Sequence, residues 1–291
     1  MISLIAQGFS KYRASGLAGI SRSMLYYDKR EREQRFDPDL EEKITSLIEE
    51  RPSYGTRRIT AMLHRQGVLS GRNRIRRHMR HLNLMHSSKK TYRKRVPRTL
   101  LVSRPNLMWE TDFTKIYIEG DGWAYLSAHV DLCSRKIKGY LVSRMVRTAE
   151  MIQTMENALL GTFPDLKIPR LILRSDNGSQ LTSRKYEEYL KSFGVYHETI
   201  HPHTPEEDAY IESYFGHFKE DYTYSREFKN FDEFSDYMDW AVKDYNSVRP
   251  HSSLNYLTPD EFESRILKDD AFRKEWIEKQ KRRYENVEFL E

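Results

Sequence analysis

A short apolar run, Leu171-Ile172-Leu173, ends abruptly in the polar residues 174–178 and constrains the fold more than any other feature of the sequence. Three apolar residues between polar segments are too few for a helix and are typical of a buried strand. Helical patterns occupy residues 148–160 before the run and 183–193 after it. A strand between two helices is typical of a parallel strand in an α/β sheet.

Three further strands are expected before this run and one after it. Residues 109–118 alternate apolar and polar side chains, and Gly120-Asp121-Gly122 is a hairpin turn into a second strand at 123–132. The third strand is expected at 136–145 and the last at 195–200. This order of strands and helices predicts an α/β fold, a mixed five-stranded sheet flanked by helices.

All-α modules are expected in front of the sheet. A helix at 9–17, a turn at Gly19 and a second helix at 22–29 with Ser21 as N-cap outline a helix-turn-helix. Three amphipathic helices are expected after Asp37-Pro38. The domains predicted are a helix-turn-helix-like segment at 1–35, a three-helix DNA-binding module at 36–86, a basic linker at 87–105, an α/β core at 106–262 and a charged helical tail at 263–291.

The net charge of +6 conceals an uneven distribution of charge along the chain. Residues 51–109 contain sixteen Lys and Arg and no acid, so the remainder carries 33 basic and 43 acidic side chains, a net charge of −10. Such segregation suits a polyanionic partner on one side of the molecule. A solvated basic face is the simpler alternative, but the size of the segment favours contact with a nucleic acid.

The third helix of the module is the expected DNA-contacting element. It starts near Ser70 and buries Ile75, Met79 and Leu82, while its polar face is almost entirely arginine. A nuclear-import signal would resemble the linker, so the linker alone is not specific. The predicted DNA contacts are Arg72, Arg74, Arg76, Arg77 and Arg80 of the helix and Lys89, Lys90, Arg93, Lys94 and Arg95 of the linker.

Three carboxylates are the candidate catalytic residues. Asp112 lies within the first strand, Asp176 lies where the buried strand runs out, and Glu212 lies on a helix whose start is marked by a capping box at 204–207. A lone acid is usually solvated. Three converging acids would repel one another unless cations were present. Two Mg²⁺ ions would relieve that repulsion and would stabilise in-line attack on a phosphodiester, and Lys219 on the same helix is expected to hold a substrate phosphate.

Other candidate chemistries are weaker. His197, His201 and His203 suggest zinc, but two prolines stiffen this loop. The nineteen tyrosines suggest a tyrosine recombinase as an alternative. That chemistry commonly uses a His-x-x-Arg motif, and no histidine of this sequence has an arginine three residues after it. Cys133, in an expected strand, is interpreted as a packing thiol. No glycine-rich phosphate loop is present, so ATP is not expected as a partner.

The expected location follows from segments that the sequence lacks. No apolar run approaches the roughly 20 residues of a membrane helix. The N-terminus has no basic region followed by an apolar stretch, so no signal peptide is expected. With a single cysteine, a disulfide framework is excluded. We therefore expect a soluble, intracellular protein without a membrane partner.

Several motifs resemble those of insertion-element DDE transposases with a retroviral-integrase-type catalytic core. They cover most of residues 38–262, and upstream the run 52–59 is similar to the helical module that precedes such cores. Two departures are Arg174, where many relatives carry histidine, and the loop 200–207. The matching pieces are Trp109 to Thr114, Tyr125-Leu126, Val130 to Arg135, Ser175 to Gln180, Glu212 to Phe215 with Lys219, Tyr245-Asn246, Arg249-Pro250-His251 and Thr258-Pro259.

The resemblance implies an RNase H-like fold and DNA cleavage that depends on two Mg²⁺ ions, with Mn²⁺ as a substitute. Asp112, Asp176 and Glu212 would be the catalytic ligands, with Asn177 and Gln180 in support. Water would attack an element end, and the resulting 3′-hydroxyl would then attack target DNA. The partner would be double-stranded DNA at the element ends and the target, and the location would be the bacterial nucleoid in the cytoplasm. Because two ends are joined, a homodimer or higher oligomer is expected on DNA. The family's retroviral branch has a His₂Cys₂ zinc module, which this chain cannot form.

Two other functions remain open at this stage. A DNA-binding regulator with an inactive core would use the same basic modules, and a structure-selective nuclease would share the fold. The complete acid set favours catalysis, and the basic helical modules favour binding to element ends. The weak first helix pair also raises the possibility that an upstream helix is supplied by a frameshift before Met1.

Overall fold

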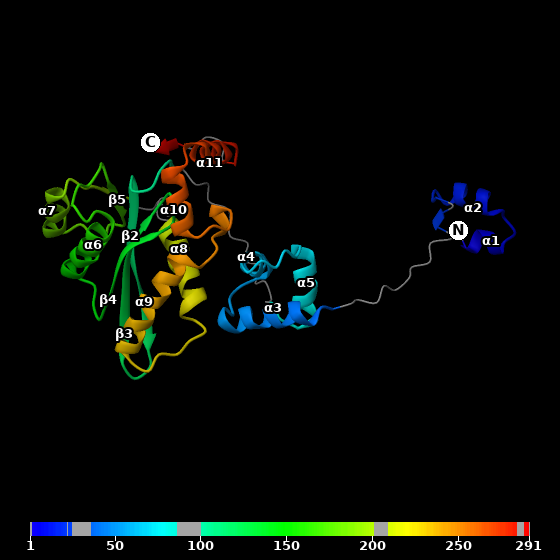
Figure 1. Cartoon of the computed structure of the whole chain (residues 1–291), viewed down its shortest axis with the longest axis horizontal. Helices are drawn as coiled ribbons and strands as arrows, with labels where there is room; N and C mark the ends of the chain where they lie inside the picture. The colour runs from blue at the N-terminus through cyan, green and yellow to red at the C-terminus, as the bar shows by residue number, and fades with distance from the viewer. Residues whose placement is uncertain are drawn as a thin grey trace. The chain divides into compact units, whose positions relative to one another are not determined.

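The computed structural model describes residues 2–21, 23–24, 36–85, 100–200, 209–283 and 288–290 (Figure 1). The chain forms two compact units, Met1–Pro38 and Asp39–Glu291. Within the described ranges, no helix is both long enough and apolar enough to cross a membrane.

The first unit is a short helical hairpin. Helices α1 (Ile2–Ala6) and α2 (Lys11–Leu17) are joined by a turn, and the Ser10 side chain caps α2 by accepting a hydrogen bond from the Arg13 backbone N–H. The expected helix at 9–17 therefore begins two residues later. Most of the second expected helix, 22–29, lies outside the described residues.

The three-helix module forms as predicted. It consists of α3 (Pro38–Glu50), α4 (Thr56–Arg65) and α5 (Arg72–His81). The three helices close around apolar side chains at helical spacing, which are fully or almost fully buried. These side chains include Leu40, Ile44, Leu47, Ile59, Leu63, Ile75 and Met79.

The predicted five-stranded mixed sheet is confirmed. Its strands are β2 (Met108–Ile118), β3 (Gly122–Asp131), β4 (Ile137–Ser143), β5 (Ile172–Ser175) and β6 (Tyr196–Thr199). Their spatial order is β4-β3-β2-β5-β6. The first three strands pair antiparallel, whereas β5 and β6 run parallel to β2. Because β5 is shorter than β2, its last residue, Ser175, lies opposite Thr111 within β2.

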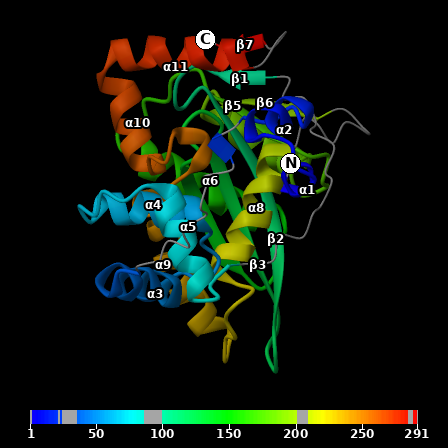
Figure 2. The same cartoon turned by 90° about the vertical axis from the view of Figure 1, so that its right-hand side faces the viewer.

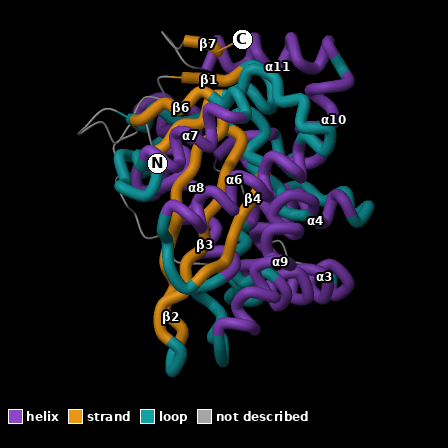
Figure 3. Tube along the Cα trace, turned by 90° about the vertical axis from the view of Figure 1, so that its left-hand side faces the viewer, coloured by secondary structure: helices purple, strands orange, loops and turns teal. Residues whose placement is uncertain are grey.

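Helices cover both faces of the sheet. Helices α6 (Thr148–Thr162) and α7 (Arg184–Ser192) pack around Trp109 on one face (Figure 3). Helices α8 (Ala209–Tyr222) and α9 (Phe231–Ser247) pack on the other face, against alternate residues of β3 (Figure 2). Alternation of side chains along each strand therefore decides which residues lie under α8.

The C-terminal boundary differs from the expected one. Residue 262 falls inside α10 (Pro259–Lys268), and α11 (Asp270–Arg283) follows. Ile266, which lies in the expected charged tail, is buried against the core, and so is Trp276. A short strand, β1 (Leu100–Val102), lies within the expected linker and pairs with β7 (Glu288–Leu290). Local periodicity could not show these long-range contacts.

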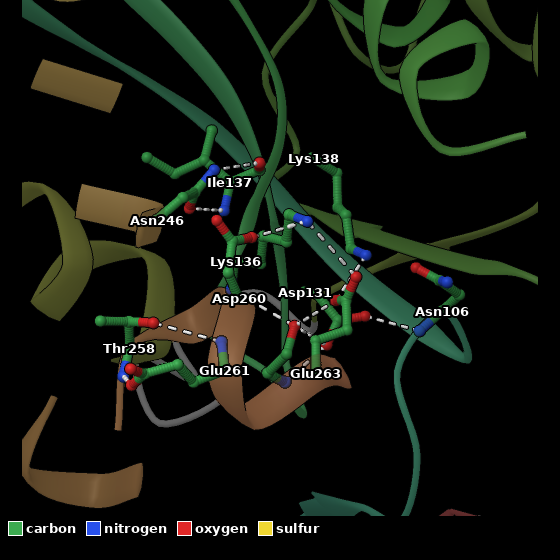
Figure 4. A network of polar contacts seen from close by, with 11 residues as sticks. Asn106, Asp131, Lys136, Ile137, Lys138, Asn246, Thr258, Asp260, Glu261 and Glu263 are labelled. Atoms are coloured by element: carbon green, nitrogen blue, oxygen red, sulfur yellow. Dashed lines mark hydrogen bonds and ion pairs between the residues drawn. The ribbon is translucent and has the colours of Figure 1, made fainter. Parts of the chain in front are cut away.

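A network of buried charges ties α10 to the β3–β4 turn (Figure 4). Asp131 is fully buried and accepts hydrogen bonds from the backbone N–H groups of Asn106 and Ser134, both at 2.6 Å. Glu263 of α10 pairs with Lys138 of β4 at 2.6 Å and accepts from the Ser134 hydroxyl at 2.8 Å. Burial raises the pKa of the Asp131 carboxyl, and Lys138 opposes that shift.

Side chains close the N-terminal turns of two helices. Asn230 caps α9 by accepting from the Glu233 N–H. Arg147 is the N-cap of α6, and the Glu150 side chain reaches back to the Arg147 backbone N–H. The capping box expected at 204–207 lies outside the described residues.

Gly139 of β4 permits a close approach between the sheet and α6. A Cβ atom at this position would lie 2.5 Å from the backbone of Ala158, which cannot move without shifting the helix. We expect Gly139→Ala to lower the free energy of unfolding by about 1–3 kcal/mol, a typical cost of overpacking. Urea denaturation measures this change.

Gly161 in α6 provides the matched control. Its added Cβ would meet only the Lys138 carbonyl oxygen at 3.8 Å, an ordinary contact distance. Gly161→Ala is expected to leave the stability unchanged or to increase it slightly, because alanine favours a helix. Equal denaturation midpoints for both variants would contradict the close approach at Gly139.

Candidate active site

The pairing of β2 with β5 brings Asp112 beside Asp176. The parallel register ends with Thr111 opposite Ser175. The next residue of each segment is an aspartate, and neighbouring strands lie about 4.8 Å apart. Both aspartates are partly exposed. Two of the three predicted acids, Asp112 and Asp176, therefore lie on neighbouring chain segments just beyond the last paired residues of β2 and β5.

A buried carboxylate ties the helix of Glu212 to the same strand. Glu110 precedes Asp112 by two residues and therefore points to the same face of the sheet. It is fully buried, and its Oε2 accepts a 2.9 Å hydrogen bond from the Ile211 backbone N–H. N–H groups in the first turn of a helix lack intrahelical partners and favour negative charge nearby. Glu110 therefore holds the first turn of α8, where Glu212 follows Ile211, over β2.

Glu110 is not among the site residues predicted from the sequence. An acid two residues before Asp112, on the same side of a strand, was the available signal. Its importance depends on the approach of α8, which is a tertiary contact. Glu110 orients the helix, whereas Asp112 and Asp176 lie at the partly exposed edge.

Glu212 lies near the N-terminal end of α8, whereas Lys219 lies near its C-terminal end. Glu212 is exposed, while Ile211 and Phe218 are buried in the core. Lys219 lies seven residues further along, about 10 Å along the helix axis. It lines a cleft of about 800 Å³ near the β2–β3 hairpin, together with Lys115. Lys219, which is expected to bind a phosphate, therefore lines this cleft.

The turn after Asp176 is shaped by side-chain hydrogen bonds. Asp176 Oδ1 accepts from the Gly178 N–H at 2.9 Å. Asn177 donates to the Ile200 carbonyl at 2.8 Å and so joins the ends of β5 and β6. A Cβ at Gly178 would lie 2.5 Å from Gln180 Nε2. The two predicted supporting residues, Asn177 and Gln180, therefore surround the loop that carries Asp176.

His197, one of the three histidines considered for zinc, is hydrogen-bonded on both ring nitrogens. Its Nε2 lies 2.8 Å from the Ser175 hydroxyl and its Nδ1 lies 2.5 Å from Glu187 Oε1. The Ser175 hydroxyl in turn donates to the Asp176 carbonyl at 2.8 Å. This chain of hydrogen bonds braces the residue before the turn. His201 and His203 lie outside the described residues.

The three acids do not form a closed cluster. Among the residues that the structure describes, no three His, Cys, Asp or Glu side chains are grouped closely enough to hold a metal ion. The donor chemistry nevertheless fits Mg²⁺, which prefers carboxylate oxygens.

Helix α5 presents the predicted arginines to solvent. Ile75 and Met79 are buried, and Glu41 of α3 lies 3.1 Å from His78 Nδ1. The five arginines of α5 are all exposed, and they give the helix a cationic outer surface. The predicted linker contacts Lys89, Lys90, Arg93, Lys94 and Arg95 lie outside the described residues.

Known families match both parts of this arrangement. Residues 102–205 and 193–259 match two models described as integrase core domain, and residues 36–95 match an HTH-like domain. The putative transposase InsK of insertion sequence IS150 from Escherichia coli K12 is 30% identical over 261 residues, covering 84% of this chain and 90% of that protein. The chain belongs to the insertion-sequence transposases with an integrase core.

Further relatives agree with this family, whose members are DDE polynucleotidyl transferases. The transposase of IS904 from Lactococcus lactis is 28% identical, and the match covers 77% of this transposase and 93% of that one. Among solved structures, the HTLV-2 integrase catalytic core in complex with magnesium is 19% identical, with a TM-score of 0.42, and covers 55% of this chain and 97% of that chain. The matched family models and the identity to InsK confirm the predicted resemblance at the level of the family.

A buried histidine lies behind the strand of Asp112. His129 of β3 pairs with Thr111, is fully buried, and lies 6.4 Å from the Trp109 ring. Neither of its ring nitrogens has a hydrogen-bond partner among the described residues. Burial lowers the pKa of His129 from 6.5 to about 3. The imidazole is therefore neutral in the folded transposase.

This burial makes stability depend on pH. Below about pH 6.5 the unfolded chain binds a proton at His129 that the folded chain does not, so the free energy of unfolding falls as pH is lowered towards 3. We expect His129→Leu to reduce this slope by up to about 1.4 kcal/mol per pH unit. Urea denaturation at several pH values between 7 and 4 measures it, with His217→Gln at an exposed site as the control. Parallel curves for wild type and His129→Leu would contradict the expectation.

Proposed function

We propose that this transposase binds the terminal repeats of an insertion element and catalyses metal-dependent cleavage and strand transfer at Asp112, Asp176 and Glu212. The observation that carries the proposal is the continuation of the β2–β5 register into two adjacent aspartates. Glu110 supports it by holding the first turn of α8, and with it Glu212, on β2.

The three carboxylates would hold two Mg²⁺ ions, with Mn²⁺ as a substitute. Such ions, when bound, stabilise the attacking and leaving oxygens of an in-line displacement at phosphorus. The residues of the chain orient that site. The Asp176 turn is tied to β6 through Asn177, and α8 is tied to β2 through Glu110. The attacking groups are water at an element end and then the freed 3′-hydroxyl at target DNA.

DNA would lie along the cationic surfaces. The arginines of α5 would contact phosphates and base edges at the terminal repeat. Lys89, Lys90, Arg93, Lys94 and Arg95 would continue the contact along the backbone. Lys219, which lines the cleft near the hairpin, would hold a phosphate of the duplex. Joining two ends in one reaction calls for a homodimer or higher oligomer on DNA.

Removal of any one carboxylate tests the catalytic assignment. We expect Asp112→Asn, Asp176→Asn and Glu212→Gln each to lower strand transfer of labelled terminal repeats in Mg²⁺ by more than about 100-fold, beyond the effect typical of residues that only support ligands. Each substitution removes an anionic oxygen and changes little else. Products are separated on denaturing gels.

Glu220→Gln is the control on the same helix. Glu220 is exposed like Glu212 but lies eight residues further along α8. Wild-type rates in an acid variant would refute the metal-ligand assignment. Sequence-specific binding with no cleavage by the wild type would favour a DNA-binding regulator, and cleavage governed by DNA structure would favour a nuclease.

The salt dependence of DNA binding tests the α5 surface. Each phosphate contact contributes about −0.9 to the slope of log K against log salt concentration. We expect Arg76→Ala and Arg77→Ala each to reduce the steepness of that slope by up to about 1. Arg184→Ala, on the α7 side of the sheet, removes an equally exposed positive charge and is expected to leave the slope unchanged. Fluorescence anisotropy at four salt concentrations provides the slopes.

A further inference from the structure

Three arginines of the three-helix module contact carboxylates of the catalytic core. Arg51 follows α3, whereas Arg58 and Arg65 lie on α4. All three belong to the acid-free basic segment. Each makes an ion pair with a carboxylate that lies more than 150 residues away in sequence. Figure 2 shows this module on the same side of the sheet as α8.

The first contact is a buried bidentate pair. Arg51 donates to both carboxylate oxygens of Asp244 in α9, at 2.7 and 2.6 Å. Both side chains are less than 10% exposed. The Tyr222 hydroxyl donates to the same carboxylate at 2.7 Å. A forked guanidinium on a planar carboxylate fixes orientation as well as distance.

The second contact lies at the C-terminal end of α8. Asp221 accepts hydrogen bonds from the Ser53 hydroxyl at 2.6 Å and from Arg58 at 2.7 Å. Its second oxygen accepts from Arg249 at 2.6 Å. Burial alone would raise the pKa of Asp221, but Arg249 and Arg58 hold it below its usual value. A carboxylate at the negative end of a helix is unfavourable unless cations surround it, as they do here.

The third contact lies nearer the surface. Arg65 donates to both oxygens of Glu261 in α10, at 2.7 and 2.5 Å, and to the Tyr256 carbonyl at 3.2 Å. Between the first two contacts, the buried Tyr54 ring lies under the guanidinium groups of Arg51 and Arg58, at 5.5 and 5.0 Å. Three separate attachment points define a single orientation of the module on the core.

This docking connects the DNA-contacting helix with the acids through α8. Asp221 and Glu212 lie nine residues apart on one helix, about 14 Å along its axis. Glu110 holds the N-terminal end of α8, and the module holds its C-terminal end. Breaking a buried ion pair by removal of one partner is strongly unfavourable, so the contact favours one arrangement over a loose tether.

We propose that Arg51, Arg58 and Arg65 form a docking surface for the core of the same chain, which sets the distance along DNA between the bases contacted by α5 and the phosphodiester that is cut. This inference rests on the proposed function. The module and the core then act on DNA as one rigid body, and the position of cleavage is measured from the position of binding.

The test compares Arg58→Ala, and Arg51→Ala as a second variant, with Arg57→Ala in the full-length transposase. Arg57 is the neighbour of Arg58 on α4 and is exposed, so the same charge is removed without loss of a core contact shown by the structure. Hydrogen exchange of residues 218–223 and 240–246 reports docking without DNA. Footprinting and nucleotide-resolution mapping of cleavage on terminal repeats report the distance between binding and cutting.

We expect the wild type and Arg57→Ala to cut at one fixed distance from the protected bases. In Arg58→Ala and Arg51→Ala, exchange of the two segments rises, the footprint on the repeat persists, and cutting at that position falls about tenfold or spreads to neighbouring positions. A single unchanged position in both docking variants, despite faster exchange, overturns this inference and leaves the proposed function standing. Unchanged exchange overturns the docking role itself. Absence of any cleavage by the wild type overturns the proposed function and this inference with it.

Discussion

The parallel pairing of β2 with β5 is the interaction on which the site depends. Four residue pairs, from Met108 opposite Ile172 to Thr111 opposite Ser175, set the register of the two strands. A slip of one residue would turn every side chain of β5 to the other face and would separate Asp112 from Asp176. Ile172 and Leu173 of β5 are buried in two different apolar clusters, and such a slip would exchange their positions.

Helix α8 is the second structural constraint because it is held by charge at both ends. A buried carboxylate from β2 meets its N-terminus, where the helix dipole is positive. Arginines from the module and from the segment after α9 surround Asp221 near its C-terminus. Between these ends, Phe218 and Tyr214 pack in the apolar core. The helix that carries Glu212 is therefore attached to the sheet and to the DNA-binding module at once.

The basic segment contains two populations of arginine with different roles. Those on α5 are exposed and form a cationic surface. Arg51 and Arg58 are wholly or largely buried, and together with Arg65 they pair with carboxylates of the core. In the amino-acid composition, the arginines of α5 and those that pair with the core cannot be told apart, because both are cations in an acid-free segment. Only the fold separates charges that face solvent from charges that join two parts of the protein.

The sequence by itself determined most of the helices and strands, their order and the family. Strand alternation, turn residues and helical spacing are local properties, so the five strands of the main sheet and the three-helix module could be predicted, as could the places of Asp112 within a strand and of Asp176 after the end of one. The buried role of Glu110, the bracing of Asp176 through His197, the burial of Ile266 and Trp276, and the docking of Arg51 were decided by tertiary structure. Each of these four features depends on contacts between residues that are far apart in the chain. Such contacts form only where two surfaces of the folded protein meet, so local sequence patterns do not reveal them.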